Sequence, residues 1–243
     1  LDRSAAEPVL LVEHPDVRRM LLSQKVIAEG ALALCLKAAM LADTAAHGAD
    51  ADTRQAAGTL LAILTPIVKT WPSEQGLVAL GQAIQVHGGY GYTRDFDVEQ
   101  LYRDSRLNPI HEGTTGIQAI DLLGRKILSE QGRSLALLLA TIRRDAAPGG
   151  RFDAQAAALR DLCDWLDGVA RAAMDAPTPD TALANATGFL EAMGHVVLAW
   201  LWLDLAPPPP PWRRTRLGPA AISSPPRFPG SAAWRRFWWT RRT

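Results

Sequence analysis

Apolar residues recur at three- and four-residue spacing through most of this chain, and the pattern stops at five consecutive prolines, residues 207–211. Such spacing places apolar side chains on one face of a helix. No stretch shows the strict apolar–polar alternation of a strand, so we predict an all-α fold. Five contiguous prolines cannot continue a helix, because each lacks an amide hydrogen and has a fixed backbone angle. We therefore expect the helical part of the chain to end near residue 206.

Turn and capping signals divide the helical part into segments. Pro72 should begin a new helix, and Thr115 with Gln118 has the form of a capping box at a helix start. The expected helices cover residues 16–47, 52–71, 73–87, 97–106, 115–128, 133–145, 153–175 and 179–205.

The charges also divide the chain at residue 206. The whole sequence has a net charge of +1, but residues 1–206 hold 18 basic and 25 acidic residues, a balance of −7. Residues 207–243 hold eight arginines and no acidic residue, a balance of +8. Arginines interleaved with tryptophan can bind nucleic acid. The Pro, Arg and Trp excess without a helical period instead favours a disordered, out-of-frame tail with no nucleic-acid partner.

Cysteine content and hydropathy exclude several classes of protein. Cys35 and Cys163 lie far apart, without a paired cysteine or histidine motif, so we predict no disulfide framework and no metal site, with both thiols buried. The most apolar stretch, residues 193–206, is shorter than the roughly 20 residues of a membrane span. The chain has no secretory leader at its start. A cytoplasmic protein fits these features.

Residues 85–118, QVHGGYGYTRDFDVEQLYRDSRLNPIHEGTTGIQ, are dense in groups that folding alone does not require. The pair Gly88–Gly89 lets the backbone turn tightly or approach a ligand, although a simple helix cap is the commoner meaning of two glycines. Glu112 stands just before a helix start, where a carboxylate usually only complements the helix dipole. These residues alone therefore leave a structural and a functional interpretation open.

The same stretch closely resembles the C-terminal helical domain of acyl-CoA dehydrogenases. It holds three motifs in that family's order: the Gln-x-x-Gly-Gly-x-Gly-Tyr turn, Leu-Tyr-Arg-Asp, and Glu-Gly-Thr. The likeness begins near residue 14, and the opening HPDVRRMLL is similar to the longer, methylthiopropanoyl-CoA dehydrogenase-like branch. The resemblance implies an incomplete four-helix bundle over residues 1–128, a helical extension over 129–206, and a remnant over 207–243.

The resemblance also implies roles for individual residues. Glu112 matches the base that removes the α-proton of an acyl-CoA thioester while a hydride passes to FAD. Thr114 matches a residue that contacts the flavin. Gln85, Gly88 and Gly89 match the turn that touches the FAD of a neighbouring subunit, which implies a homo-oligomer, a dimer or tetramer. An electron-transferring flavoprotein is the electron acceptor that the family implies.

Several positions depart from the family's pattern. His111 replaces a tyrosine before the base, and Gly116 replaces a glutamine beside FAD. We interpret Arg103 and Asp104 as a structural ion pair, and the three tyrosines, Tyr90, Tyr92 and Tyr102, as packing around the flavin-side loop.

Two functions remain open at this point. The first is a fragment of a flavin-dependent acyl-CoA dehydrogenase, inactive alone because the domains that complete its flavin and substrate sites are missing from the sequence. The second is a non-catalytic helical bundle that acts in oligomerisation or partner binding.

Overall fold

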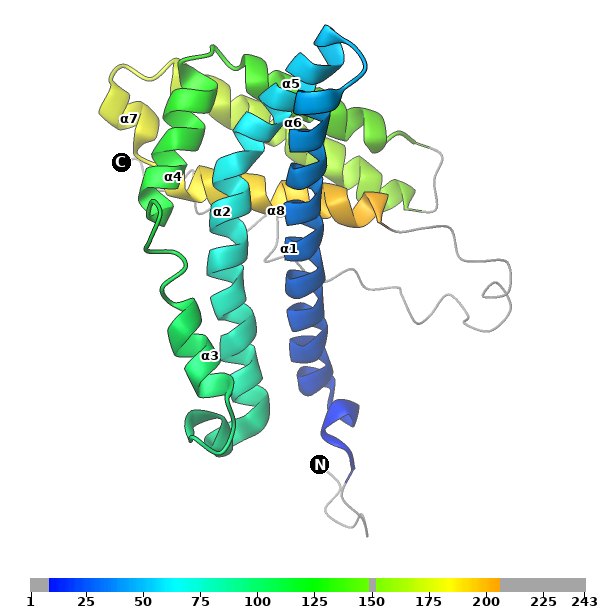
Figure 1. The fold of residues 1–243 in the computed structure, drawn as a ribbon, viewed down its shortest axis with the longest axis vertical. Helices are drawn as coiled ribbons and strands as arrows, with labels where there is room; N and C mark the ends of the chain where they lie inside the picture. The colour runs from blue at the N-terminus through cyan, green and yellow to red at the C-terminus, as the bar shows by residue number, and fades with distance from the viewer. Residues whose placement is uncertain (1–8, 149–151, 206–243) are drawn as a thin grey trace, which may run out of the picture. The chain divides into compact units, whose positions relative to one another are not determined.

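Every regular element in the described chain, residues 9–148 and 152–205, is a helix in the computed structural model (Figure 1). This confirms the predicted all-α class for those residues. The tail 207–243 lies outside the described residues, so its predicted disorder stays a prediction. The elements are η1 (Leu11–Glu13), α1 (Pro15–His47), α2 (Ala51–His87), η2 (Gly88–Tyr92), α3 (Val98–Ser105), α4 (Thr115–Ile120), η3 (Asp121–Leu128), α5 (Arg133–Asp145), α6 (Asp153–Met174), α7 (Pro179–Leu183) and α8 (Ala186–Asp204).

The two longest helices, α1 and α2, lie side by side and run in opposite directions (Figure 1). Asp50 caps α2, because its carboxylate accepts hydrogen bonds from the backbone N–H of Thr53 at 2.7 Å and from the Thr53 hydroxyl at 3.0 Å. These bonds, the backbone one first, lower the pKa of Asp50. The short connection between the helices is closed by Arg54, which donates to the Gly48 carbonyl at 2.8 Å.

The predicted break at Pro72 is wrong, because α2 continues through both Pro66 and Pro72. A proline inside a helix removes one backbone hydrogen bond. Packing outweighs that loss here, since Ile67 and Trp71 lie buried on the same helix face between the two prolines. The neighbouring hydroxyl of Ser73 donates to the Lys69 carbonyl at 2.5 Å, which adds a local bond on this turn.

Helix α8 crosses behind α1 and α2 (Figure 1), and two glycines permit the close approach. A Cβ on Gly194 would lie 2.3 Å from Cδ1 of Trp71 in α2, and one on Gly30 of α1 would lie 2.7 Å from Cδ1 of Leu198 in α8. At Gly194 the Cβ would meet the ring and the Cβ of the buried Trp71, so this crossing requires glycine there, whereas at Gly30 the Leu198 side chain could shift its end to make room.

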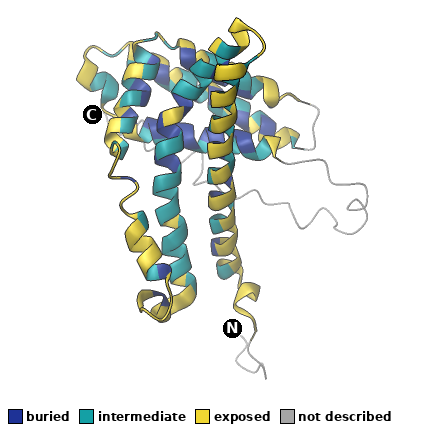
Figure 2. Cartoon of the chain, in the orientation of Figure 1, coloured by how far each residue is buried: buried dark blue, intermediate teal, exposed yellow. Residues whose placement is uncertain are grey.

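One hydrophobic core joins these helices and extends across residue 128, the boundary predicted between bundle and extension. Its largest fully buried side chains include Leu34 of α1, Ile63 of α2, Leu138 of α5 and Trp200 of α8. No fully buried residue between Trp71 and Ala119 belongs to this core, although the structure describes that whole segment, and only the partly buried Ala79 packs against it there. Figure 2 shows the consequence, with buried residues concentrated around α8 and few along the lower part of α2 or along α3.

The predicted capping box is displaced by one residue. Thr114, not Thr115, caps α4, since its hydroxyl accepts from the Ile117 N–H at 3.5 Å. Thr115 instead donates its hydroxyl to Glu74 of α2. The helix then widens into the π-helical stretch η3, after which the Ser129 N–H bonds to the carbonyl five residues earlier at 3.0 Å.

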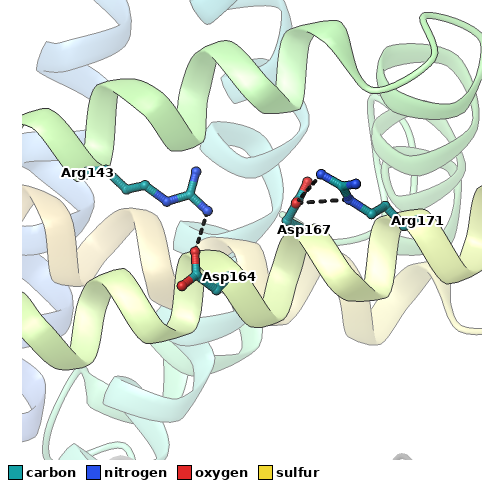
Figure 3. A network of polar contacts seen from close by, with 4 residues as sticks. All are labelled: Arg143, Asp164, Asp167 and Arg171. Carbon is teal, nitrogen blue, oxygen red and sulfur yellow. Dashed lines mark hydrogen bonds and ion pairs between the residues drawn. The ribbon is translucent and has the colours of Figure 1, made fainter.

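Helices α5 and α6 pack side by side beyond η3 (Figure 3). Arg143 of α5 reaches Asp164 of α6 at 2.6 Å, while Asp167 and Arg171 pair within α6 at 2.8 Å. These side chains are largely solvent-exposed, so each pair contributes only about 0–1 kcal/mol. The apolar contacts beneath them hold the two helices together.

The two cysteines differ. Cys163 is buried in α6, as predicted, and burial raises the pKa of its thiol to about 11. Cys35 is exposed on α1, so the prediction of a buried thiol is wrong there. Its apolar neighbours Leu32 and Leu36 are also exposed, which means that apolar spacing on α1 marks more than one face.

The segment Pro179–Asp204 contains an 18-residue window that is long and apolar enough, by length and composition, to cross a membrane, with a mean hydropathy of 1.3. The helix is interrupted between Leu183 and Ala186, which separates α7 from α8, so the predicted single helix 179–205 is wrong. Leu183 contacts η3 near Gly124, and α8 supplies the centre of the hydrophobic core. Packing against the rest of the helical part, residues 9–148 and 152–205, therefore accounts for the apolar character of this segment.

Candidate functional site

All five predicted site residues lie in the segment between Trp71 and Ala119, which adds no fully buried residue to the core, but they lie in two places. Gln85, Gly88 and Gly89 are at the far end of α2, and Glu112 and Thr114 are in the loop before α4. That loop contacts α2 at Lys69, sixteen residues before Gln85. At 1.5 Å per residue the two places are about 24 Å apart along the helix. The fold of the described residues therefore does not bring the five site residues into one pocket.

The glycine turn after α2 has three glycines with different structural roles. Gly88 has a φ of +63°, and a Cβ on Gly91 would lie 2.5 Å from the Ile84 carbonyl oxygen, so the fold requires glycine at both. A Cβ on Gly89 would meet no atom within 4 Å. Gly89 and the exposed Gln85 therefore leave backbone open to another molecule.

The aromatic residues after this turn do not form the packing that we predicted. Tyr90 is 66% exposed and Tyr92 is 85% exposed, while Tyr102 is 39% exposed. Phe96 contacts two of the aromatic rings: its ring centroid lies 5.0 Å from that of His87 and 6.4 Å from that of Tyr90. Within the described residues these tyrosines are surface groups.

The predicted pairing of Arg103 with Asp104 is wrong, because Arg103 pairs with Glu99 one helical turn earlier, at 3.2 Å. Residues four apart lie on the same face of a helix, whereas successive residues point in different directions, which places Glu99 better than Asp104 to pair with Arg103. Both Arg103 and Glu99 line a shallow hollow of about 310 Å³ beside Arg94.

Glu112 has a strained backbone and an exposed side chain. Its φ is +54°, a left-handed conformation that costs a non-glycine residue free energy, and Gly113 follows with a φ of +92°. His111 beside it is also exposed. The loop therefore turns sharply at Glu112, the predicted base, and the carboxylate of Glu112 lies at the surface.

Two polar side chains of α2 hold the Glu112 loop. The ammonium of Lys69 donates to the carbonyl of Gly113 at 2.6 Å and to that of Asn108 at 3.0 Å. Glu74, just over one turn further along α2, accepts the hydroxyl of Thr115. Neither residue was predicted from the sequence, because about 40 residues separate Lys69 and Glu74 from their partners in the loop and the motifs do not connect them.

A second hollow, of about 270 Å³, lies between α2, α4 and α8. Its lining includes Trp71, Glu74, Thr115 and Glu191. Burial, and then the negative charge of Glu74, raise the pKa of Glu191. Burial lowers the pKa of His195, whose Nδ1 lies 3.4 Å from Nε1 of Trp71.

No three His, Cys, Asp or Glu side chains in the described part of the chain are placed to hold a metal ion. The polar groups around the Glu112 loop can instead hold and move protons, since they are carboxylates, hydroxyls and an ammonium. The open backbone at Gly89 offers a separate surface for contact.

Comparison with known proteins gives two family matches. Residues 2–128 match the acyl-CoA dehydrogenase C-terminal domain, and residues 135–207 match the acetyl-CoA dehydrogenase C-terminal-like domain.

The curated relatives include 3-methylmercaptopropionyl-CoA dehydrogenase of Ruegeria pomeroyi, 36% identical over 82% of this chain and 35% of that protein. The broad-specificity linear acyl-CoA dehydrogenase FadE5 of Mycobacterium tuberculosis is 35% identical over 81% of this chain and 34% of its own length. The chain thus spans about a third of each of these relatives.

A solved structure of Caenorhabditis elegans ACDH-11 in complex with C11-CoA has the same fold, with a TM-score of 0.64 and 19% identity over 79% of this chain and 33% of that one. The family match covers more than half of the sequence and includes both groups of predicted site residues. By this match, the chain belongs to the acyl-CoA dehydrogenase family and carries its C-terminal helical domain.

Proposed function

We propose that this chain supplies the C-terminal helical part of an FAD-dependent acyl-CoA dehydrogenase, with Glu112 as the base. One observation carries the proposal: an exposed carboxylate sits on a strained turn that hydrogen bonds from outside the turn hold in place. Strain of this kind persists only where the surrounding structure enforces it, and it occurs frequently at functional sites.

Glu112 would take the α-proton of an acyl-CoA thioester. A carboxylate can accept a proton, but a solvated carboxylate is a weak base. Since Glu112 is exposed in this unit, the desolvation that would strengthen it must come from substrate or from other protein surfaces. The left-handed turn fixes the direction in which the side chain leaves the backbone.

The residues present fit FAD at two surfaces. Gly89 has open space where a Cβ would stand, and Gln85 beside it is exposed, so this turn would contact an adenine–diphosphate group held by a neighbouring subunit. Thr114, exposed at the start of α4, would contact the flavin. When bound, FAD accepts the hydride that leaves the β-carbon. The 24 Å between the two surfaces agrees with contacts to two different FAD molecules.

The proposal includes the remaining partners of such an enzyme. The substrate is an acyl-CoA, the assembly is a homo-oligomer (a dimer or tetramer), and an electron-transferring flavoprotein reoxidises the flavin. The location is cytoplasmic. Support comes from the family match and from the open backbone at Gly89, which a neighbouring subunit could approach.

The proposal is tested by flavin binding and by acyl-CoA oxidation. In the intact FAD-loaded enzyme of which this chain would be the C-terminal part, an acyl-CoA should be oxidised, and Glu112→Gln should abolish this reaction while the flavin spectrum stays unchanged. Glu13→Gln, which removes an exposed carboxylate in η1, should behave like the wild type. Full activity in Glu112→Gln would exclude Glu112 as the base.

A second function, a non-catalytic oligomerisation or partner-binding module, is favoured by an apolar stripe on α1. Leu32, Leu36 and Met40 follow one another at four-residue spacing and are 60%, 56% and 63% exposed. Exposed apolar surface of this kind commonly marks an interface. Light scattering and an FAD titration separate the two functions: a stable oligomer that takes up no FAD under any condition would favour the module.

A further inference from the structure

The turn at Glu112 is held by few bonds of its own. The Thr115 N–H donates to the Pro109 carbonyl at 3.3 Å, and the side-chain amide of Gln118 donates to the Glu112 carbonyl at 3.3 Å. Both distances are longer than usual for such bonds. A left-handed φ at a glutamate costs free energy, so these local bonds alone are a weak constraint.

Lys69 supplies a stronger constraint from α2. Its ammonium bridges the Asn108 and Gly113 carbonyls, one on each side of Glu112. Hydrogen bonds from a charged donor are shorter and stronger than neutral ones, and the 2.6 Å contact with Gly113 is of this kind. Among the described residues no carboxylate forms an ion pair with Lys69, so its charge is directed at the loop.

Glu74 holds the other end of the same loop. It accepts the hydroxyl of Thr115, which directly follows the helix cap Thr114. Lys69 and Glu74 are five residues apart on α2, and α2 is anchored beside them by the buried Trp71. A rigid helix thus contacts the loop both before and after the residue that carries the carboxylate.

We infer that Lys69 and Glu74 are positioning residues, which together fix the loop of residues 108–115 and so the direction of the Glu112 carboxylate. This inference rests on the proposed role of Glu112 for its catalytic meaning, but the clamp itself is a property of this chain. It extends the site to α2, a helix on which the family motifs mark only the far end at Gln85.

Hydrogen–deuterium exchange of the purified chain tests the clamp without any need for activity. Lys69→Met retains the apolar stem but loses both hydrogen bonds. Exchange in residues 107–115 should rise about tenfold or more, because a charged hydrogen bond is lost and the loop opens locally. Lys69→Arg, which keeps donors at this site, should restore part of the protection. Lys25→Met, on an exposed part of α1, is the matched control and should leave the loop unchanged.

The second anchor is tested in the same way. Glu74→Leu and Thr115→Val each remove one partner of the hydroxyl bond and should speed exchange in the same peptide, whereas Glu74→Gln keeps an acceptor and should stay near the wild type. Unchanged exchange in Lys69→Met and Glu74→Leu would overturn the inference. So would an equal rise in α5 to α8, since that would show a loss of general stability rather than of loop position.

Kinetics of the intact FAD-loaded enzyme that contains this chain then give the catalytic consequence, with wild type and variants compared in that enzyme. Lys69→Met should lower kcat about tenfold to a hundredfold while KM for the acyl-CoA changes little, because a misplaced base slows proton removal more than binding. Unchanged kcat in a variant with fast loop exchange would overturn the catalytic part of the inference. If the wild type itself oxidises no acyl-CoA, the proposed function fails, and the exchange result still decides whether the clamp exists.

Discussion

Two parts of this molecule are built differently. In α5 to α8 each long helix buries an apolar face, and side chains such as Leu138 and Trp200 are almost completely inaccessible to water. Residues 72–118 fold into helices and turns of similar regularity, but Val98 is the one large apolar side chain there that is buried. All five candidate site residues lie in this second part. The difference shows that the part which carries the site depends on anchors from elsewhere, while the other part supplies the stability.

The largest expected effect comes from two leucine substitutions that compare these parts. Leu138→Ala empties a site with 0% exposure and should lower the free energy of unfolding by about 2–5 kcal/mol. Leu101→Ala in α3, at 53% exposure, should change it by less than about 0.5 kcal/mol. Urea denaturation followed by circular dichroism measures both. Similar losses at the two positions would mean that α3 is buried in solution, for example against another copy.

A pair of glycine substitutions should give a smaller contrast of opposite sign. Gly194→Ala forces a Cβ against Trp71 and should cost about 1–3 kcal/mol of unfolding free energy. Gly116→Ala in α4 meets open space and should be neutral or stabilising by up to about 1 kcal/mol, since alanine favours a helix. Thermal unfolding of both variants measures the contrast. A large loss of stability in Gly116→Ala would show that another molecule contacts this position, because no atom of the described residues lies within 4 Å of the added Cβ.

The smallest expected effect is a pH dependence at the border of the two parts. Burial lowers the pKa of His195 below its usual value of 6.5. Below that pH the unfolded chain binds a proton that the folded chain resists, so stability should fall as the pH drops from 7.5 to 5.5. His195→Gln should flatten this dependence, and His111→Gln at an exposed position should not.

Glu191 contributes with the opposite sign. Its raised pKa means that the folded chain takes up a proton more readily than the unfolded chain, so this group adds stability as the pH falls through that raised value. Glu191→Gln should therefore steepen the loss of stability toward the acid end of the range from pH 7.5 to 5.5, as the pH approaches the ordinary glutamate pKa of 4.5 from above. Equilibrium unfolding at several pH values measures both variants. A dependence that is identical in wild type, His195→Gln and Glu191→Gln would exclude these groups as its source.

Much of the fold could be predicted where helical spacing and turn signals agree. The predicted bounds of α5, residues 133–145, are those of the structure, because a regular apolar face lies between clear turns. Pro72 misled the prediction, since the cost of one lost hydrogen bond is local while the packing that offsets it comes from other helices. Cys35 misled it as well, because spacing alone does not say which apolar face of α1 is covered.

The candidate site could be predicted only as far as its motifs reach. Glu112 and the glycine turn stand in short motifs that the sequence displays directly, and their roles stay predictions. Lys69 and Glu74 give no such signal, because a lysine and a glutamate on a helix are ordinary surface residues until the loop is folded against them. The ion pair of Arg103 with Glu99 likewise depends on helical geometry and not on adjacency in sequence.

By itself the sequence determined the all-α class, most of the helix bounds and the membership of the acyl-CoA dehydrogenase family, since periodicity and motifs are local properties of a chain. Only the tertiary structure decided that α2 is one helix, that α8 crosses it at Gly194, and that Lys69 and Glu74 hold the Glu112 loop. The last two of these features join residues some 40 to 120 positions apart. Their energy comes from burial and from charged hydrogen bonds that exist only after the helices have packed.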